Sequence, residues 1–181
     1  MTNYAKIISS GSYLPDKVLT NKDLENMVDT SDQWITDRTG IKERRVSSKE
    51  ETSVDMAFHA SKDALSKSSI KKEDIGAIFL ATCTPERKFP STAVLLQNKL
   101  DIKNAFSFDV NAACTGFIYA LDIAKKYIES GQIKYALVVG TEKITSLLDW
   151  TDRNTCVLFG DGAGAMIIGS SETPGIMSSS I

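Results

Sequence analysis

The sequence FDVNAACTGF, residues 108–117, contains the transition that decides the fold of this chain. An apolar run over residues 105–110 predicts a short buried strand, which stops before a cysteine among small residues. Over residues 117–129 the polar side chains recur at helical spacing, which predicts an amphipathic helix. We therefore expect Cys114 at the N-terminus of this helix, with Gly116 permitting a tight turn between strand and helix.

The surroundings of Cys114 leave two interpretations open. The unpaired amide groups and the dipole at a helix N-terminus favour the anionic thiolate, which makes a thiol nucleophilic and able to accept an acyl group. Its own backbone N–H is then placed to donate to the oxyanion that develops during acyl transfer. A cysteine among alanines at the end of an apolar strand is, however, more often a small buried hydrophobic residue.

Short apolar strands alternate with helices along the chain. The first strand is expected around Ile7 and Ile8. The alternation predicts an α/β protein, with a mixed, largely parallel sheet flanked by helices. In such sheets ligands bind at the carboxyl ends of the strands, where Cys114 is expected. The further expected helices are residues 21–28, 32–39, 52–66 and 91–100, and the further strands are residues 75–82, 135–140 and 165–168.

Local signals predict the ends of several helices. Asn21 is expected to cap the first helix and Ser31 the second, which Gly40 stops. The apolar side of the helix at residues 52–66 is expected to carry Val54, Phe58 and Leu65.

The glycine-rich segment at residues 159–169 has the glycine spacing of a phosphate-binding loop. A dinucleotide-binding loop requires a helix after its glycines, whereas residues 165–168 form a short apolar strand. We therefore expect these glycines to allow close backbone packing.

Composition excludes several classes of function. The chain has 181 residues, of which 42% are hydrophobic and 24% charged, as in a globular protein with one substantial core. Its 21 basic and 23 acidic residues give a net charge of −2 without a long basic run, so nucleic-acid binding is not expected. Lys42, Arg44 and Arg45 form only a small basic cluster, which we interpret as a solvated loop.

No targeting or membrane segment is expected. Residues 1–6 lack the features of a signal peptide, and no apolar stretch approaches the roughly 20 residues that cross a bilayer. A cytoplasmic protein is therefore expected. Its 3 cysteines, Cys83, Cys114 and Cys156, are odd in number and widely spaced, so we expect reduced thiols and no metal site.

The residues around Cys114 resemble a known nucleophile motif. The sequence AACTGF, residues 112–117, is similar to that of the thiolase-like condensing enzymes, and in particular of the beta-ketoacyl-[acyl-carrier-protein] synthase III family, which begins bacterial fatty acid synthesis. The resemblance runs over residues 6–177. It implies a thiolase-like fold in which residues 1–181 are the N-terminal half, with residues 16–51 as a coenzyme A-binding insertion, and the C-terminal half is absent.

The resemblance also implies roles for other residues. Residues Thr30, Trp34 and Arg38 match the family's coenzyme A-binding element, in which the tryptophan stacks on adenine and the arginine meets the phosphates. Arg153 matches the residue that stacks on the opposite adenine face. Phe89 matches a residue that reaches across a dimer interface and closes the neighbouring acyl pocket. The chemistry is consistent, because indole and guanidinium groups both stack on aromatic faces, and guanidinium also pairs with phosphate.

The implied reaction has two stages and uses no cofactor beyond the coenzyme A thioester. Cys114 takes an acetyl or similar short acyl group from acyl-coenzyme A, and the carbanion formed by decarboxylation of malonyl-acyl-carrier protein then attacks the thioester. In the family, a histidine and an asparagine from the second half promote decarboxylation, and the enzyme is a homodimer. His59 is the only histidine here and matches no such position, so we expect it to be structural.

We therefore expect a truncated acyltransferase that does not complete condensation alone. One alternative is a non-catalytic half-fold that binds coenzyme A or a partner subunit. Another is a related condensing enzyme, such as a quinolone or polyketide starter synthase, which has the same nucleophile.

Overall fold

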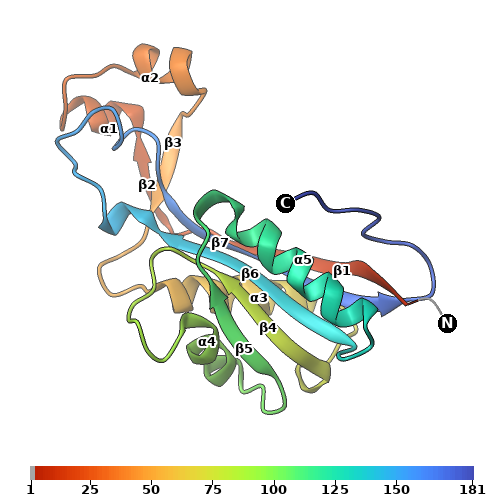
Figure 1. Ribbon diagram of the computed structural model, residues 1–181. Coiled ribbons are helices and arrows are strands. Elements are labelled where there is room, and N and C mark those ends of the chain that lie inside the picture. The colour runs from red at the N-terminus through yellow and green to blue at the C-terminus, as the bar shows by residue number, and fades with distance from the viewer. Residues whose placement is uncertain (1–2) are drawn as a thin grey trace.

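The computed structural model describes residues 3–181, which form a five-stranded sheet with helices on both faces and a small unit beyond one end (Figure 1). The strand order is β1-β7-β6-β4-β5. β4 pairs in parallel with β5 and β6, whereas β7 is antiparallel to β6 and β1. The expected mixed α/β sheet is therefore confirmed. Its strands are β1 (Tyr4–Tyr13), β4 (Ile75–Ala81), β5 (Phe106–Val110), β6 (Tyr135–Lys143) and β7 (Asp161–Ser171).

Helices cover the two faces of this sheet. Alternate residues of β4 point to opposite faces, so Ile78 and Leu80 pack with α3 and α4 while Ala77 and Phe79 pack with α5. A strand buried on both faces reads as a continuous apolar run, which is why β4 was recognisable from its sequence. These helices are α3 (Ser53–Ser66), α4 (Thr92–Leu100) and α5 (Gly116–Glu129).

The buried face of α3 agrees with the expected one only in part. Val54 is buried as expected, but Phe58 and Leu65 are only partly buried against the core, whereas Ala57, Ala60 and Ala64 are fully buried. The reason is the close approach of β1, because a Cβ at Gly11 would lie 2.2 Å from the backbone nitrogen of Ala64. Only small side chains fit between elements at this separation.

The small unit, residues 17–46, follows β1. Its two strands form a separate antiparallel pair, and neither was predicted. The first helix is capped by Thr20 rather than Asn21 and ends at Glu25, whereas the second has the expected cap, Ser31, and stop, Gly40. The elements are β2 (Lys17–Thr20), α1 (Asn21–Glu25), α2 (Asp32–Thr39) and β3 (Glu43–Val46).

Of the basic cluster in this unit, only Lys42 lies exposed in a loop as expected. Arg44 and Arg45 belong to β3, and Arg44 is only 5% exposed. The sequence interpretation was wrong because the groups that surround Arg44 come from distant parts of the chain.

The glycine-rich segment forms the start of β7 instead of a phosphate loop. A Cβ at Gly160 would lie 3.0 Å from the carbonyl oxygen of Arg45, and one at Gly162 would lie 3.0 Å from Leu14. Close packing is therefore confirmed for Gly160 and Gly162, but a Cβ at Gly164 would meet nothing within 4 Å. Three short 3₁₀ turns complete the elements: η1 (Lys72–Asp74), η2 (Ala113–Thr115) and η3 (Ile144–Ser146). No helix in the described part of the chain is long and apolar enough to cross a membrane.

Candidate functional site

The carboxyl ends of β1, β4, β5 and β6 meet at one end of the sheet. In the strand register, Ala81 lies opposite both Val110 and Gly140, and Tyr13 lies opposite Ala163 near the start of β7. Cys114 follows β5 at this end, from which the small unit also extends (Figure 1). The expected place of Cys114 at a carboxyl strand end is confirmed.

Cys114 lies in η2, immediately before α5 begins at Gly116. The tight turn is made by Ala113, whose φ of +46° is uncommon for a residue with a Cβ, whereas Gly116 has a helical φ of −54°. Gly116 serves packing instead, because a Cβ there would lie 3.2 Å from that of Ala81. The side chain of Cys114 is exposed, so the interpretation as a buried hydrophobic residue is wrong.

The thiol lines a pocket of about 430 Å³, which we call the thiol pocket. Small and apolar residues from several strand ends form much of its lining, among them Ala81, Phe117, Gly140 and Ala163. A nucleophile in an open, mainly apolar pocket can meet a thioester whose acyl chain packs against the lining.

Glu142 places a carboxylate in the thiol pocket. Its two oxygens accept hydrogen bonds from the backbone N–H of Cys83 at 2.7 Å and from the hydroxyl of Thr84 at 2.6 Å. The carboxylate therefore fastens the loop after β4 to the end of β6. Further along this loop lies Phe89, which is 87% exposed. Glu142 was not predicted from the sequence, although a charged residue near the end of a buried strand is a recognisable signal.

Asp161 connects the small unit to the sheet, and it was also missed. This buried carboxylate accepts from the backbone and hydroxyl of Ser47 at 2.8 and 2.7 Å, and from those of Thr145 at 2.9 and 2.6 Å. The end of β3, η3 and the start of β7 are thereby held together.

The structure brings together three residues that the sequence analysis assigned to coenzyme A. The guanidinium carbons of Arg38 and Arg153 lie 4.3 and 4.5 Å from the centre of the Trp34 ring. Arg153 also donates to the carbonyl oxygen of Asp29 at 2.7 Å. Near them, the hydroxyl of Thr30 is buried without a hydrogen-bond partner among residues 3–181. An indole with two cations offers stacking and charge to a nucleotide, whereas the buried hydroxyl of Thr30 would first have to be uncovered.

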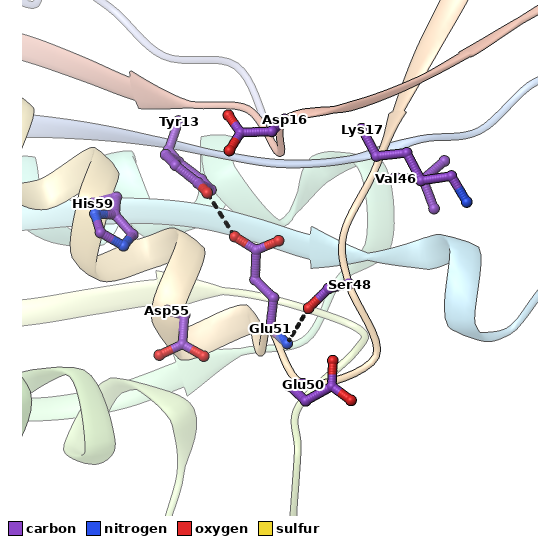
Figure 2. Close-up of a pocket in the computed structure, with 9 residues that line it drawn as sticks. All are labelled: Tyr13, Asp16, Lys17, Val46, Ser48, Glu50, Glu51, Asp55 and His59. Carbon is purple, nitrogen blue, oxygen red and sulfur yellow. Dashed lines mark hydrogen bonds between the residues drawn. The ribbon is translucent and has the colours of Figure 1, made fainter.

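A second pocket of about 570 Å³ is rich in carboxylates (Figure 2). The hydroxyl of Tyr13 donates to Glu51 at 2.6 Å, and this bond, together with burial, raises the pKa of Tyr13 to about 12. His59 stacks on the Tyr13 ring with the ring centres 4.8 Å apart, and it lines this pocket rather than the thiol pocket. Within residues 3–181, no cluster of three or more histidines, cysteines or carboxylates is placed to hold a metal ion.

The sequence is similar to that of proteins with a described activity. Residues 108–181 match the model of a family described as 3-oxoacyl-[acyl-carrier-protein (ACP)] synthase III. The chain is 58% identical over 167 residues to the beta-ketoacyl-[acyl-carrier-protein] synthase III of Aquifex aeolicus, a match that covers 92% of this chain and 54% of the relative. The chain spans about half the length of the curated relatives it matches.

Solved structures show the same likeness. The crystal structure of 3-oxoacyl-[acyl-carrier-protein] synthase III from Aquifex aeolicus superposes with a TM-score of 0.91 at 57% identity, covering 93% of this chain and 55% of that one. The priming beta-ketosynthase from the R1128 polyketide pathway superposes with a TM-score of 0.93 at 37% identity, covering 96% of this chain and 52% of the other. Both matches include nearly all of the fold described above.

Proposed function

Since the chain belongs to the beta-ketoacyl-[acyl-carrier-protein] synthase III family, we propose that Cys114 accepts a short acyl group, such as acetyl, from an acyl-coenzyme A. The observation that carries this proposal is the exposed thiol at the tight turn before α5, at the edge of a mainly apolar pocket. The full reaction that we propose is the first condensation of fatty acid synthesis, with malonyl-acyl-carrier protein as the second substrate and no cofactor.

The residues of this chain supply the acyl-transfer stage. The Cys114 thiol loses its proton, and its sulfur attacks the carbonyl carbon of the thioester. The backbone N–H of Cys114 stabilises the resulting oxyanion, aided by the dipole of α5, a 14-residue helix. The intermediate collapses as the bond to the sulfur of coenzyme A breaks, and that sulfur takes up a proton. An acyl-cysteine remains.

We further propose that residues 16–51 form the coenzyme A-binding insertion. Trp34 and Arg153 stack on the adenine, Arg38 meets the phosphates, and Thr30 offers its unpaired hydroxyl once that buried group is uncovered. The pair of cations over one indole supports this assignment, because a nucleotide combines an aromatic base with negative charge.

Phe89 is proposed to close the acyl pocket of a second subunit in a homodimer. An aromatic side chain that is 87% exposed supports this, since such exposure leaves a large apolar area without a partner among residues 3–181.

A starter synthase of polyketide synthesis is the second candidate. The TM-score of 0.93 to the priming beta-ketosynthase favours it, whereas the higher sequence identity of 57% to the Aquifex aeolicus structure favours the first candidate. The two differ in acyl donor, so acylation rates with acetyl-coenzyme A and with longer acyl-coenzyme A thioesters separate them.

The central test is incubation with radiolabelled acetyl-coenzyme A, followed by mass spectrometry of the peptide that contains Cys114. We expect an acetyl group on Cys114, none in Cys114→Ala, and normal labelling in the matched control Cys83→Ala. Bound coenzyme A without acylation of the thiol would instead favour a non-catalytic binding unit.

A further inference from the structure

Arg44 is a buried cation in the small unit. It is 5% exposed, and the described part of the chain places no carboxylate in an ion pair with it. Removal from water lowers the pKa of its guanidinium below the ordinary value. Burying an uncompensated charge is costly, so its position requires a specific set of hydrogen bonds.

Those hydrogen bonds join two segments that are far apart in sequence. Nη1 donates to the side-chain oxygen of Asn21 at 2.8 Å and lies 3.4 Å from the carbonyl oxygen of Leu19, at the start of the small unit. Nη2 donates to the carbonyl oxygen of Val157 at 2.6 Å, 113 positions away. Val157 follows shortly after Arg153, so one guanidinium connects the small unit with the segment that carries this residue.

Asn21 continues the connection to α2. Its side-chain nitrogen donates to Asp32 at 2.7 Å and to the carbonyl oxygen of Ile41 at 2.8 Å. Asp32 is the first residue of α2, the helix that carries Trp34. Arg44 is therefore linked through Asn21 to one side of the proposed nucleotide site and directly, through Val157, to the other.

Apolar contacts alone do not determine this geometry. Ile35 of α2 packs against Cys156 and Val157 in one buried cluster, with Trp34 at its edge. Such contacts are non-directional, so they bring the two segments together without fixing their relative angle. Hydrogen bonds are directional, and a planar guanidinium holds several acceptors in one plane.

We infer that Arg44 is a positioning residue for the nucleotide end of coenzyme A, which it does not touch. By bonding to Asn21 and Val157, it fixes the backbone of α2, which carries Trp34, relative to the segment that carries Arg153, so that both side chains border one site. This rests on the proposed function only in assigning Trp34 and Arg153 to the nucleotide. Arg44 has no part in the chemistry at Cys114.

The test measures two properties of the same protein. Calorimetry measures the dissociation constant of coenzyme A, and mass spectrometry measures the rate at which iodoacetamide alkylates Cys114. We expect Arg44→Met to weaken coenzyme A binding about tenfold or more, since hydrogen bonds of a charged group are lost, while alkylation of Cys114 keeps its rate. Arg44→Lys keeps the charge but loses the planar set of guanidinium N–H donors. It is expected to weaken coenzyme A binding to a similar degree.

Arg45→Met is the matched control. Arg45 is the next residue of β3, is partly exposed, and donates to the carbonyl oxygen of Pro15 rather than to either side of the nucleotide site. The Arg45→Met variant should change neither the dissociation constant of coenzyme A nor the alkylation rate of Cys114. Unchanged coenzyme A binding in both Arg44 variants would overturn the inference, as would an equal loss of binding and of Cys114 alkylation. Failure of acetyl-coenzyme A to acylate Cys114, with coenzyme A binding retained, would overturn the proposed acyl transfer and leave this inference standing.

Discussion

The guanidinium carbon of Arg153 lies 4.5 Å from the centre of the Trp34 ring. Carbon atoms touch at about 3.5–4.0 Å, so no planar base fits between these two groups in this conformation. Arg153 is held there by Asp29, whose carbonyl oxygen accepts a hydrogen bond and whose carboxylate lies 3.6 Å from the guanidinium. Adenine stacking between Trp34 and Arg153 therefore requires Arg153 to move away from the ring.

Arg153→Ala is expected to weaken coenzyme A binding by about 0.5–2 kcal/mol, the range of a cation–π contact. This loss of affinity is offset in part, because coenzyme A binding to the variant does not require an arginine side chain to move off the Trp34 ring. Calorimetry measures the change, with Lys88→Ala as the control for a basic residue far from Trp34 in the sequence. An unchanged affinity would count against Arg153 as an adenine contact.

Glu142→Gln is expected to destabilise the fold by about 1.5–3 kcal/mol, because a charged acceptor of two hydrogen bonds is replaced by a neutral one. Cys83 and Thr84 donate these bonds at 2.7 and 2.6 Å. Urea unfolding followed by circular dichroism measures the loss. The exposed Glu73 provides the control, and Glu73→Gln should leave the free energy of unfolding nearly unchanged. Equal stability of both variants would mean that the carboxylate does not fasten the loop.

Elements with local signals could be predicted from the sequence. The second helix begins and ends as expected, because Ser31 caps its start and Gly40, with φ +73°, ends it. Both signals lie next to the helix in the sequence. The strands β2 and β3 carry no such signal. Each has four residues and exists because it pairs with the other across the intervening helices.

The site could be predicted only in part for the same reason. The turn at Cys114 lies within one stretch of sequence, so its place at a strand end was predictable. Arg44 was misinterpreted because its acceptors Asn21 and Val157 lie 23 and 113 positions away. Whether a charged residue is buried depends on such distant groups, and the residues next to Arg44 in the sequence do not reveal them.

Asp55 is expected to make stability depend on pH. Desolvation raises its pKa, but hydrogen bonds from Lys99 and Thr52 outweigh this and lower the pKa to about 2, from an ordinary value of 3.8. A lowered folded-state pKa stabilises the fold above the unfolded value, and this contribution is lost as the pH falls from about 4 to about 2.

Asp55→Asn should therefore cost about 1 kcal/mol at pH 7, since the partly exposed side chain is screened by solvent. Urea unfolding at pH 7 and at pH 3 measures the difference between wild type and variant, which should narrow at the lower pH. The exposed Asp74 serves as control, with little effect expected from Asp74→Asn at either pH. A difference that does not change with pH would contradict the assignment.

Ala113→Gly is expected to stabilise the fold by about 0.5–1 kcal/mol, because Ala113 has a φ of +46° that only glycine adopts without strain. Ala112 has a φ of −146°, so Ala112→Gly should destabilise the fold. Glycine there adds conformational freedom to the unfolded chain without relieving strain in the folded one. Thermal unfolding of the two variants measures both changes. If the turn holds the thiol in its reactive position, the more flexible Ala113→Gly should also acylate Cys114 more slowly. A stabilised variant with unaltered acylation would mean that the backbone at Ala113 has no part in presenting the thiol.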